Sequence, residues 1–184
     1  MAIEMEKKYR LADGDRIRIA LSLEELGSSH IGLHFEENVI YSSSELMDRS
    51  SIVRIRLVGG RSLMTFKRRL ESRFDVKEQV EYETEVSDAS ETKSILQELG
   101  LHPRVIYEKR RDVWRLRSAE VVLDELPFGD FMEIEGSLSS IREVEMLLGI
   151  DDIPVELETY PRLTARLGVD VDGVIEARFT RAER

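Results

Sequence analysis

The stretch Ile-Glu-Met-Glu-Lys-Lys-Tyr, residues 3–9, has the alternation of a β-strand with one charged face. Successive side chains of a strand point to opposite faces, so Glu4, Glu6 and Lys8 share one face, and the other is mostly apolar. Two carboxylates placed in this way lie roughly 7 Å apart and repel each other by about 2 kcal/mol at an effective dielectric constant of about 20. Either water screens them on an exposed face, or a divalent cation lies between them while Lys8 is directed at an anion.

A cationic face is predicted from a hairpin. Residues 51–58 and 61–70 have strand-like patterns, and Gly59-Gly60 between them is typical of a two-residue turn. Such a turn pairs Val58 with Arg61, Arg56 with Leu63 and Arg54 with Thr65. One face then carries Arg54, Arg56, Lys67 and Arg69, and the other carries Val53, Ile55, Leu57, Met64 and Phe66.

An acidic face is predicted from a later hairpin, with strands at 120–126 and 131–136. If residues 127–130 form its loop, Leu126 pairs with Phe131 and Asp124 with Glu133, and Glu135 lies on the same face. Opposed like charges destabilise a hairpin, so this acidic face also needs a compensating partner.

The remaining elements follow from periodicity and capping signals. Further strands are expected at 33–41, at 77–86 with Glu81 and Glu83 on one face, and at 105–116 with Lys109 and Arg111 together. Residues 42–50 are expected to be a polar loop. Helices are expected from Asp13 or Asp15 to Leu26, from 88 to 99, from a Ser140/Glu143 capping box to Gly149, and at 159–167 with an interruption near Pro161.

Composition limits the classes of protein that fit. The 184 residues suit one domain, predicted to cover 1–168, with a weakly patterned peripheral tail at 169–184. No signal peptide or apolar run of membrane-spanning length is present, which predicts a cytoplasmic protein without a membrane partner. A net charge of −10 without a long basic stretch argues against nucleic acid. The absence of cysteine excludes thiolate chemistry, and a homodimer is compatible with the sequence.

The sorting of the charges suggests a closed barrel. An open sheet with one solvated face explains why each strand has a charged side, but not why some strands are acidic and others basic. A closed antiparallel barrel with its apolar residues outside, covered by helices, would direct both sets into its lumen. An oligophosphate with a divalent metal would satisfy both, because lysine and arginine hold phosphate oxygens and carboxylates hold the metal. All-oxygen ligands favour Mg²⁺ or Mn²⁺.

Five motifs in order resemble the CYTH family, the triphosphate tunnel metalloenzymes, over roughly residues 2–165. They are Glu4-x-Glu6-x-Lys8, Arg54-x-Arg56, Leu63-Met64-Thr65-Phe66-Lys67, Lys109-x-Arg111, and Leu123-Asp124-Glu125 followed by Phe131-Met132-Glu133-Ile134-Glu135. The family includes class IV adenylate cyclases, thiamine triphosphatases and inorganic triphosphatases. The resemblance implies an α+β, mainly β fold: a closed eight-stranded antiparallel β-barrel with flanking helices.

The resemblance also implies roles for individual residues. The metal-binding candidates are Glu4, Glu6, Glu133 and Glu135, with Asp124 at the metal or its water, and the catalytic candidates are Glu4, Glu6, Lys8 and Asp124. The triphosphate would be held by Lys8, Arg54, Arg56, Lys67, Lys109 and Arg111. Glu81 and Glu83 would bind a second metal or orient basic residues. Gln79 departs from the family pattern, in which a basic residue is common; Lys77 or Arg69 is a candidate substitute, although Arg69, Glu85 and Glu120 are interpreted as rim or solvent charges.

The leading hypothesis is a Mg²⁺- or Mn²⁺-dependent phosphohydrolase acting on inorganic triphosphate, thiamine triphosphate or a nucleoside triphosphate. The first alternative is a class IV-like adenylate cyclase that forms cyclic AMP and pyrophosphate from ATP, and the second is a non-catalytic phosphate-binding module. A base pocket would favour the cyclase; its aromatic candidates are Phe35, Tyr41 and Phe128, which packing explains equally well.

Overall fold

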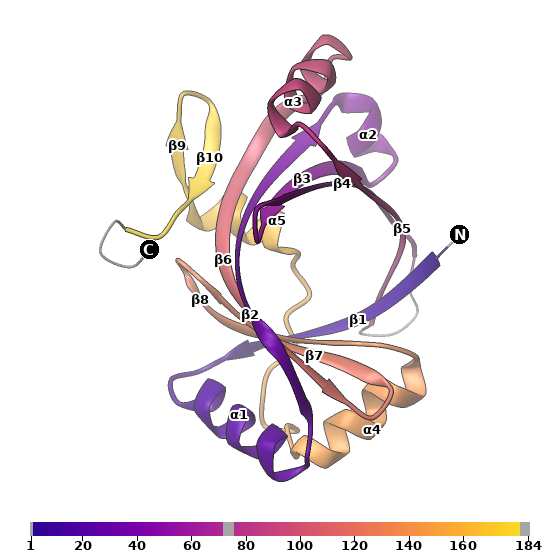
Figure 1. The fold of residues 1–184 in the computed structure, drawn as a ribbon, viewed down its shortest axis with the longest axis vertical. Coiled ribbons are helices and arrows are strands. Elements are labelled where there is room, and N and C mark those ends of the chain that lie inside the picture. The colour runs from indigo at the N-terminus through magenta and orange to yellow at the C-terminus, as the bar shows by residue number, and fades with distance from the viewer. Residues whose placement is uncertain (1, 72–75, 181–184) are drawn as a thin grey trace.

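The computed structural model describes residues 2–71 and 76–180. Eight antiparallel strands close into a barrel in the order β2-β3-β4-β5-β1-β8-β7-β6, because β6 pairs again with β2 (Figure 1). Their bounds are β1 Ala2–Leu11, β2 Ser29–Ser42, β3 Ser51–Val58, β4 Arg61–Arg69, β5 Lys77–Val86, β6 His102–Leu116, β7 Ala119–Leu126 and β8 Gly129–Glu135. The predicted closed eight-stranded barrel is confirmed. β2 and β6 are longer than predicted because they pair with each other along most of their length.

The β3–β4 hairpin has the predicted register. Arg54 lies opposite Thr65 and Arg56 opposite Leu63, across the turn at Gly59 and Gly60. Both glycines have positive φ, 55° and 76°, a conformation that side chains with a Cβ disfavour and that a tight hairpin turn requires. The turn therefore fixes which face the arginines occupy.

The predicted register of the β7–β8 hairpin is wrong by two residues. Leu126 lies opposite Gly129 and Asp124 opposite Phe131, so only Pro127 and Phe128 form the loop. Proline is favoured at the second position of a four-residue turn and glycine at the fourth, which explains the shorter loop. Because the error is two residues, every side chain keeps its predicted face, although the acids opposed on the face of Glu133 are Glu120 and Glu135.

The main hydrophobic core lies outside the barrel. The helices α1 (Asp15–Glu25) and α4 (Leu138–Leu148) pack Ile19, Leu23, Ile141 and Val144 against the outward-facing Val121, Leu123, Met132 and Ile134. Figure 1 shows both helices below the barrel, and α2 (Ser44–Asp48) and α3 (Ala89–Glu98) at its other end. With its apolar side chains turned outward, the barrel is left with a charged lumen.

Helix boundaries differ from the predictions at three places. α2 replaces the expected polar loop, because Ser43 caps it by accepting a hydrogen bond from the Leu46 N–H at 3.3 Å. Ser137, rather than Ser140, is the N-cap of α4. α5 (Tyr160–Leu167) runs through Pro161 without interruption, because a proline in the first turn removes no intrahelical hydrogen bond.

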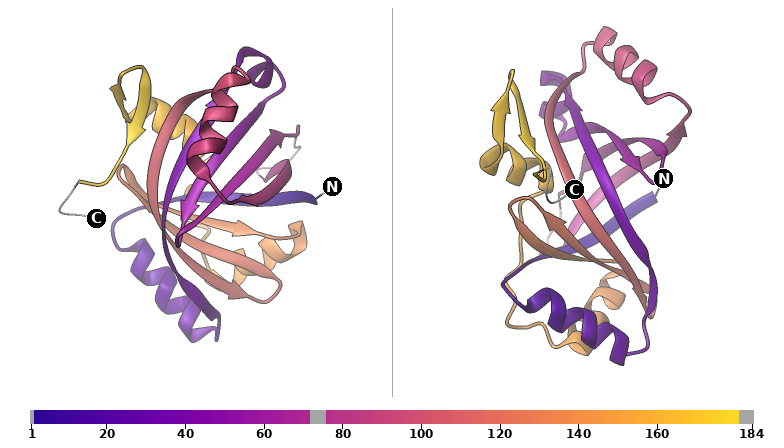
Figure 2. Two further views of the ribbon diagram at one scale, coloured as in Figure 1. Left: turned by 45° about the horizontal axis from the view of Figure 1, so that its top comes forward. Right: turned by 60° about the vertical axis from the view of Figure 1, so that its left-hand side comes forward.

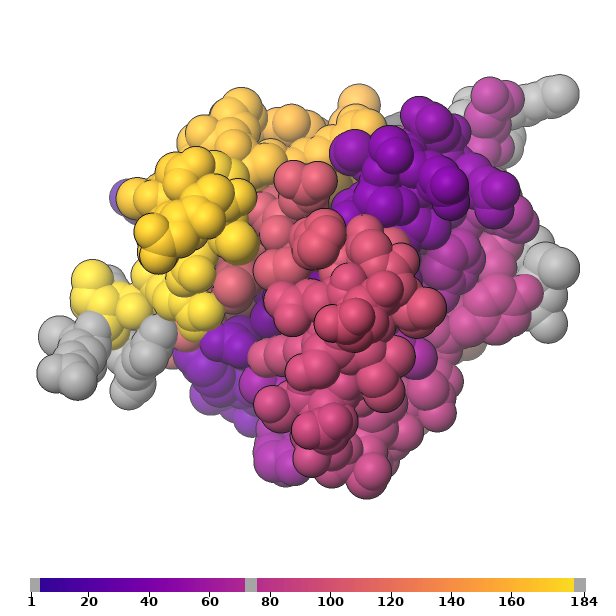
Figure 3. Space-filling view, turned by 90° about the horizontal axis from the view of Figure 1, so that it is seen from above, coloured from indigo at the N-terminus to yellow at the C-terminus, as the bar shows by residue number. Residues whose placement is uncertain are grey.

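The carboxyl-terminal segment adds two strands that the weak sequence pattern did not indicate. β9 (Val169–Val171) and β10 (Val174–Ala177) form a hairpin, and β10 pairs in parallel with β6 (Figure 2). Beyond them, the guanidinium of Arg178 lies 3.1 Å from Glu108, and Phe179 is buried. The space-filling view shows this segment at the surface beside the barrel (Figure 3). Within the part of the chain described, no helix is long and apolar enough to cross a membrane.

Candidate active site in the barrel lumen

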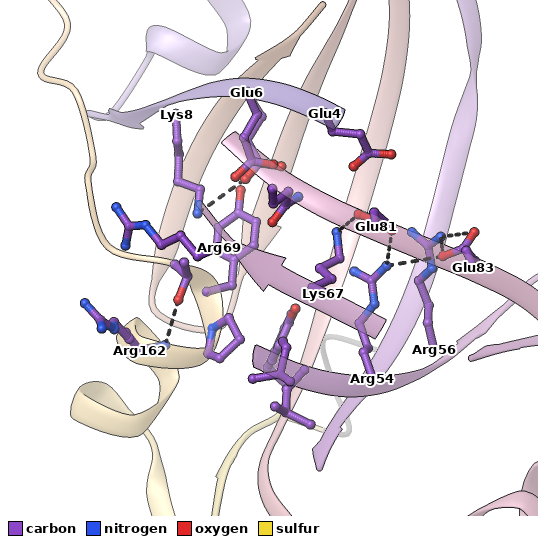
Figure 4. Close-up of a pocket in the computed structure, with 18 of the residues that line it drawn as sticks. Glu4, Glu6, Lys8, Arg54, Arg56, Lys67, Arg69, Glu81, Glu83 and Arg162 are labelled. Atoms are coloured by element: carbon purple, nitrogen blue, oxygen red, sulfur yellow. Dashed lines mark hydrogen bonds and ion pairs between the residues drawn. The ribbon is translucent and has the colours of Figure 1, made fainter. Parts of the chain in front are cut away.

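The lumen contains a cavity of about 610 Å³, within the size range of small-molecule sites. Of the predicted site residues, all but Asp124 line it: Glu4, Glu6, Lys8, Arg54, Arg56, Lys67, Glu81, Glu83, Lys109, Arg111, Glu133 and Glu135. Figure 4 shows Glu4, Glu6, Lys8, Arg54, Arg56, Lys67, Glu81 and Glu83 around it. The strand alternation of β1 places Glu4, Glu6 and Lys8 inside while Tyr9 joins the outer core. The structure therefore brings together side chains that are up to 131 positions apart in the sequence.

Lys8 is held in place by groups from two distant elements. Its Nζ lies 3.3 Å from the Glu133 carboxylate, donates to the Glu158 carbonyl at 3.2 Å, and lies 3.6 Å from the centre of the Tyr160 ring. The side chain is almost fully buried. These contacts fix the ammonium group at the end of the lumen that α5 approaches.

Asp124 is completely buried and does not line the cavity, although its partners do. It accepts hydrogen bonds from Lys109 Nζ at 3.2 Å, from Arg111 Nε and Nη2 at 2.8 and 2.6 Å, and from the Tyr160 hydroxyl at 2.9 Å. Both carboxylate oxygens are thus engaged. This geometry favours a role in positioning Lys109 and Arg111, and the metal-binding role of Asp124 stays a prediction.

Glu81 and Glu83 lie against the basic side chains of β3 and β4. Arg54 and Arg56 donate to Glu83 at 3.4 and 2.9 Å, and Lys67 forms an ion pair with Glu81. Of the two roles that the resemblance implies for these glutamates, orienting basic residues is the one these contacts favour. Gln79 also lines the lumen, whereas Lys77 Nζ lies 3.3 Å from Glu6.

Glu36 on β2 is a buried acidic residue that the sequence reasoning missed. Its two carboxylate oxygens lie 3.5 Å from Arg56 Nη1 and 3.5 Å from Lys109 Nζ, so it links the basic groups of β3 and β6. Burial acts to raise the pKa of Glu36, but attraction to Lys109, Arg111 and Arg56 holds it well below its ordinary value. The alternation Glu36-x-Asn38 within the expected strand could have indicated a polar, lumen-facing side of that strand.

Glu36→Gln is expected to lower the free energy of unfolding by about 3 kcal/mol at neutral pH, because Lys109 and Arg56 lose a buried counter-charge. A depressed carboxyl pKa stabilises the fold above the unfolded-state pKa of about 4.3, and this contribution is lost as pH falls toward the folded-state pKa. The difference between native protein and variant should therefore shrink below about pH 4. Urea titrations from pH 7 to pH 3 measure it; a constant difference would contradict the assignment.

The glutamates at the β1–β8 side of the lumen suit a divalent cation. Burial, followed by a hydrogen bond to and repulsion from Glu81, raises the pKa of Glu4 to about 8. Burial and repulsion from Glu6 and Glu120 also raise the pKa of Glu135. In the described chain neither Glu4 nor Glu135 forms an ion pair, whereas Glu6 and Glu133 do. A cation would relieve this crowding of carboxylates.

Residues 2–71 and 76–180 contain no cluster of three or more acidic or histidine side chains already converged on a metal position. This agrees with the usual coordination of Mg²⁺ in proteins, in which one or two carboxylates bind the ion and substrate phosphates and water complete its coordination shell. One or two of the four glutamates Glu4, Glu6, Glu133 and Glu135 would therefore suffice to hold a metal that binds together with a phosphate ligand.

Several other residues place further charge or bulk at the lumen. Arg69, Glu120 and Arg162 line the cavity, whereas Glu85 is exposed and lies 2.7 Å from Arg61 Nη2. The aromatic candidates for a base pocket, Phe35, Tyr41 and Phe128, are not among the cavity-lining residues that the structure describes. Within the described part of the chain, the aromatic side chains that line it are those of Tyr107 and Tyr160.

Comparison with known proteins places the chain in a family. The model of the CYTH domain family matches residues 2–150. The PH1012 protein of Pyrococcus horikoshii is 27% identical, with a TM-score of 0.75 over 87% of this chain and 98% of its own. A conserved hypothetical protein of Pyrococcus furiosus is 24% identical, with a TM-score of 0.76 over 87% and 99%.

A third similar structure is a Hippeastrum protein, described as a putative adenylyl cyclase with a dominant triphosphatase activity. It is 20% identical, with a TM-score of 0.66 over 94% of this chain and 99% of its own, and at this identity it supports the fold alone. The search of curated proteins finds no match. The family match over most of the chain, together with the charged lumen of an eight-stranded barrel, shows that the protein belongs to the CYTH domain family.

Proposed function

We propose that the protein is a divalent-metal-dependent phosphohydrolase that acts on a triphosphate in the barrel lumen. The observation that supports this most strongly is the composition of the cavity wall, in which the described residues include eight lysine and arginine side chains and seven glutamates. A phosphate ligand alone would explain the basic side chains, and a metal ion alone would explain the glutamates. A phosphate chain that carries a divalent cation explains why both sets line the same cavity.

The basic residues would bind the phosphate oxygens. Lys8, Lys109 and Arg54 are buried and already oriented by carboxylates, so little side-chain freedom is lost when a ligand binds. Arg54 and Arg56 each have a buried Nε–H without a hydrogen-bond partner in the described chain, and they have spare capacity for an acceptor. The planar guanidinium group of Arg56 matches phosphate geometry, whereas the Nε and Nη2 of Arg111 already donate to Asp124.

The carboxylates Glu4, Glu6, Glu133 and Glu135 would hold the metal. When bound, Mg²⁺ or Mn²⁺ would offset the phosphate charge and lower the pKa of a water molecule. In the hydrolytic step, the water oxygen forms a bond to the terminal phosphorus as the bond from that phosphorus to the bridging oxygen breaks. A glutamate of the lumen accepts the proton that the attacking water loses. Hydrolysis of inorganic triphosphate then gives diphosphate and orthophosphate. Lys8, Lys109 and Arg111 stabilise the charge that develops on the phosphate oxygens.

A class IV-like adenylate cyclase is the alternative. Ile40, Met47, Ile52 and Pro161 line the cavity and give it an apolar region that could contact an adenosine group. In that reaction the ribose 3′ oxygen forms a bond to the α-phosphorus, and pyrophosphate leaves. The two reactions differ in which phosphorus faces the nucleophile.

Product analysis tests the proposal. The purified protein is incubated with Mg²⁺ or Mn²⁺ and, separately, inorganic triphosphate, thiamine triphosphate or ATP, and the products are followed by ³¹P NMR. Metal-dependent release of orthophosphate is expected. Cyclic AMP with pyrophosphate would replace the proposal with the cyclase, and binding without any product would favour the non-catalytic phosphate-binding module.

A further inference from the structure

The chain between α4 and β9 is attached to β1 before it forms α5. The Glu156 N–H donates to the Lys8 carbonyl at 2.8 Å, and the Arg10 N–H donates to the Pro154 carbonyl at 3.0 Å. β8 already pairs with β1 at these positions, so the two bonds occupy the other edge of β1, beyond the part that pairs with β5. One end of this segment is therefore fixed beside Lys8, whose side chain lines the lumen.

The other end of the segment is attached to β6. β10 pairs in parallel with residues 105–107 of β6, whereas β7 pairs with β6 from Arg110 onward. Figure 1 shows β9 and β10 on the outer side of β6. Residues 154–179, which we call the carboxyl-terminal belt, thus run from β1 through α5 to β6.

Glu108 anchors the end of the belt to the outer face of β6. Its carboxylate is buried, and it accepts hydrogen bonds from Arg178 Nη1 at 3.1 Å and from the Phe179 N–H at 2.9 Å. The same Nη1 lies 2.6 Å from Glu37 of β2. Glu108 directly precedes Lys109, and neighbouring side chains of a strand point to opposite faces, so this anchor lies behind a basic residue of the lumen.

Between its two attachments, the belt contacts two groups of the site. The Glu158 carbonyl accepts a hydrogen bond from Lys8 Nζ at 3.2 Å, and the Tyr160 hydroxyl donates to Asp124 at 2.9 Å. Asp124 in turn accepts hydrogen bonds from two basic side chains that line the lumen. Ala177 of β10 belongs to the same hydrophobic cluster as Tyr160, so the position of β10 bears on the position of α5.

From these contacts we infer that Arg178 is a positioning residue for the lumen. By pairing with Glu108, Arg178 holds the belt against β6. The belt then keeps Tyr160 and the Glu158 carbonyl at the groups that orient the phosphate-binding side chains. This inference rests on the proposed function for the identity of the ligand. Part of the segment that the sequence predicted to be a peripheral tail would thus contribute to the site.

Amide hydrogen exchange tests whether Arg178 holds the belt. Arg178→Gln removes the charge that faces the buried Glu108, and the main core lies elsewhere, around α1 and α4, so the variant should fold. Amides of residues 154–167 should exchange at least about tenfold faster than in the native protein, while those of β3 and β4 stay unchanged. Arg178→Lys keeps the charge and should restore most of the protection. Unchanged exchange in the belt, or equally faster exchange throughout the barrel, would contradict the inference.

Kinetics with inorganic triphosphate and Mg²⁺ or Mn²⁺ test whether the belt positions the site. Arg178→Gln should lower kcat/KM about tenfold at a temperature at which it is fully folded, because small displacements of binding groups reduce the rate strongly. Arg61→Gln is the matched control, because it removes an exposed ion pair with Glu85 outside the cavity lining and should leave kcat/KM unchanged.

A double variant gives a readout that a general loss of stability would not reproduce. When Arg178→Gln is combined with Tyr160→Phe, the loss of kcat/KM should be smaller than the product of the two single losses, because both changes act through α5. Losses that multiply, or an unchanged kcat/KM in Arg178→Gln despite a loosened belt, would overturn the positioning role.

Calorimetric titration separates a failure of this inference from a failure of the proposed function. If the native protein hydrolyses triphosphate and Arg178→Gln keeps full activity, the positioning role is contradicted and the triphosphatase stands. If the native protein hydrolyses nothing, the proposed function is contradicted. The affinity for inorganic triphosphate with Mg²⁺ then tests the belt, and Arg178→Gln should lower it about tenfold. Equal affinity in the two proteins, or no binding by either, would overturn the inference.

Discussion

Glu4→Gln and Glu6→Gln should each reduce metal-dependent turnover of triphosphate by at least about 100-fold, since disturbing even the outer partners of a metal site typically costs 10- to 100-fold. Both residues line the lumen from β1, and glutamine offers a neutral oxygen in place of a charged ligand. The initial rate of orthophosphate release over a range of Mg²⁺ and Mn²⁺ concentrations measures the effect. Full turnover with unchanged metal dependence would contradict the placement of the metal.

The stability of Glu4→Gln provides a second readout. Burial and the neighbouring Glu81 raise the pKa of Glu4 to about 8, so its ionised form is unfavourable in the folded protein. The glutamine variant should therefore unfold at the same temperature as the native protein or at a higher one, while turnover is lost. Glu85→Gln is the control, because Glu85 is an exposed glutamate outside the cavity lining and should affect neither quantity.

Asp124→Asn should have the largest effect on stability, lowering the free energy of unfolding by about 3–5 kcal/mol. The variant keeps one oxygen but removes the charge that compensates Lys109 and Arg111, both of which are held at 3.2 Å or less. Chemical denaturation monitored by tryptophan fluorescence measures the loss. The pair Lys109 and Arg111 should also lose orientation, so the KM for triphosphate should rise in the fraction that folds.

Tyr160→Phe tests separately how much the hydrogen bond from Tyr160 to Asp124 and the charge of Asp124 each stabilise the fold. The phenylalanine ring keeps the packing below Lys8 and removes only the hydroxyl that donates to Asp124 at 2.9 Å. A smaller loss of stability is expected than for Asp124→Asn, about 1 kcal/mol, because the other donors to Asp124 remain. An equal loss in both variants would show that the charge of Asp124 is not what stabilises this region.

The barrel and most of its lumen could be predicted from the sequence because strand alternation is a strict rule. The Gly59-Gly60 turn fixed the pairing of β3 with β4, and parity then placed Arg54, Arg56 and Lys67 on one face. The same rule made the β7–β8 face robust: a register error of two residues left Glu133 and Glu135 inside.

What the sequence did not reveal depends on contacts between distant segments. Glu36 is recognisable as a site residue only when β2 is known to lie between β3 and β6, which brings Arg56 and Lys109 to its carboxylate. Tyr160 is 36 positions from Asp124, and nothing in the local pattern of α5 indicates that contact. The short strands β9 and β10 have no clear alternation in their sequence. β10 can be recognised as a strand only from its pairing with β6.

The ion pairs of the lumen also bear on how a ligand would bind. Arg54, Arg56 and Lys67 are paired with Glu81 and Glu83, so phosphate oxygens must compete with carboxylates for the same donors. A ligand without a metal would bring further negative charge next to Glu4 and Glu135. Triphosphate should therefore bind much more tightly when Mg²⁺ or Mn²⁺ accompanies it.

A crystal structure of the protein with inorganic triphosphate and Mn²⁺ would show whether the lumen is the metal and phosphate site, because anomalous scattering locates the metal independently of the phosphates. We expect the phosphate chain to lie in the lumen against Arg54, Lys109 and Arg111, with Mn²⁺ bound by carboxylates that include Glu4 or Glu6. Phosphate on the outer surface, or Mn²⁺ away from the β1 carboxylates, would contradict it.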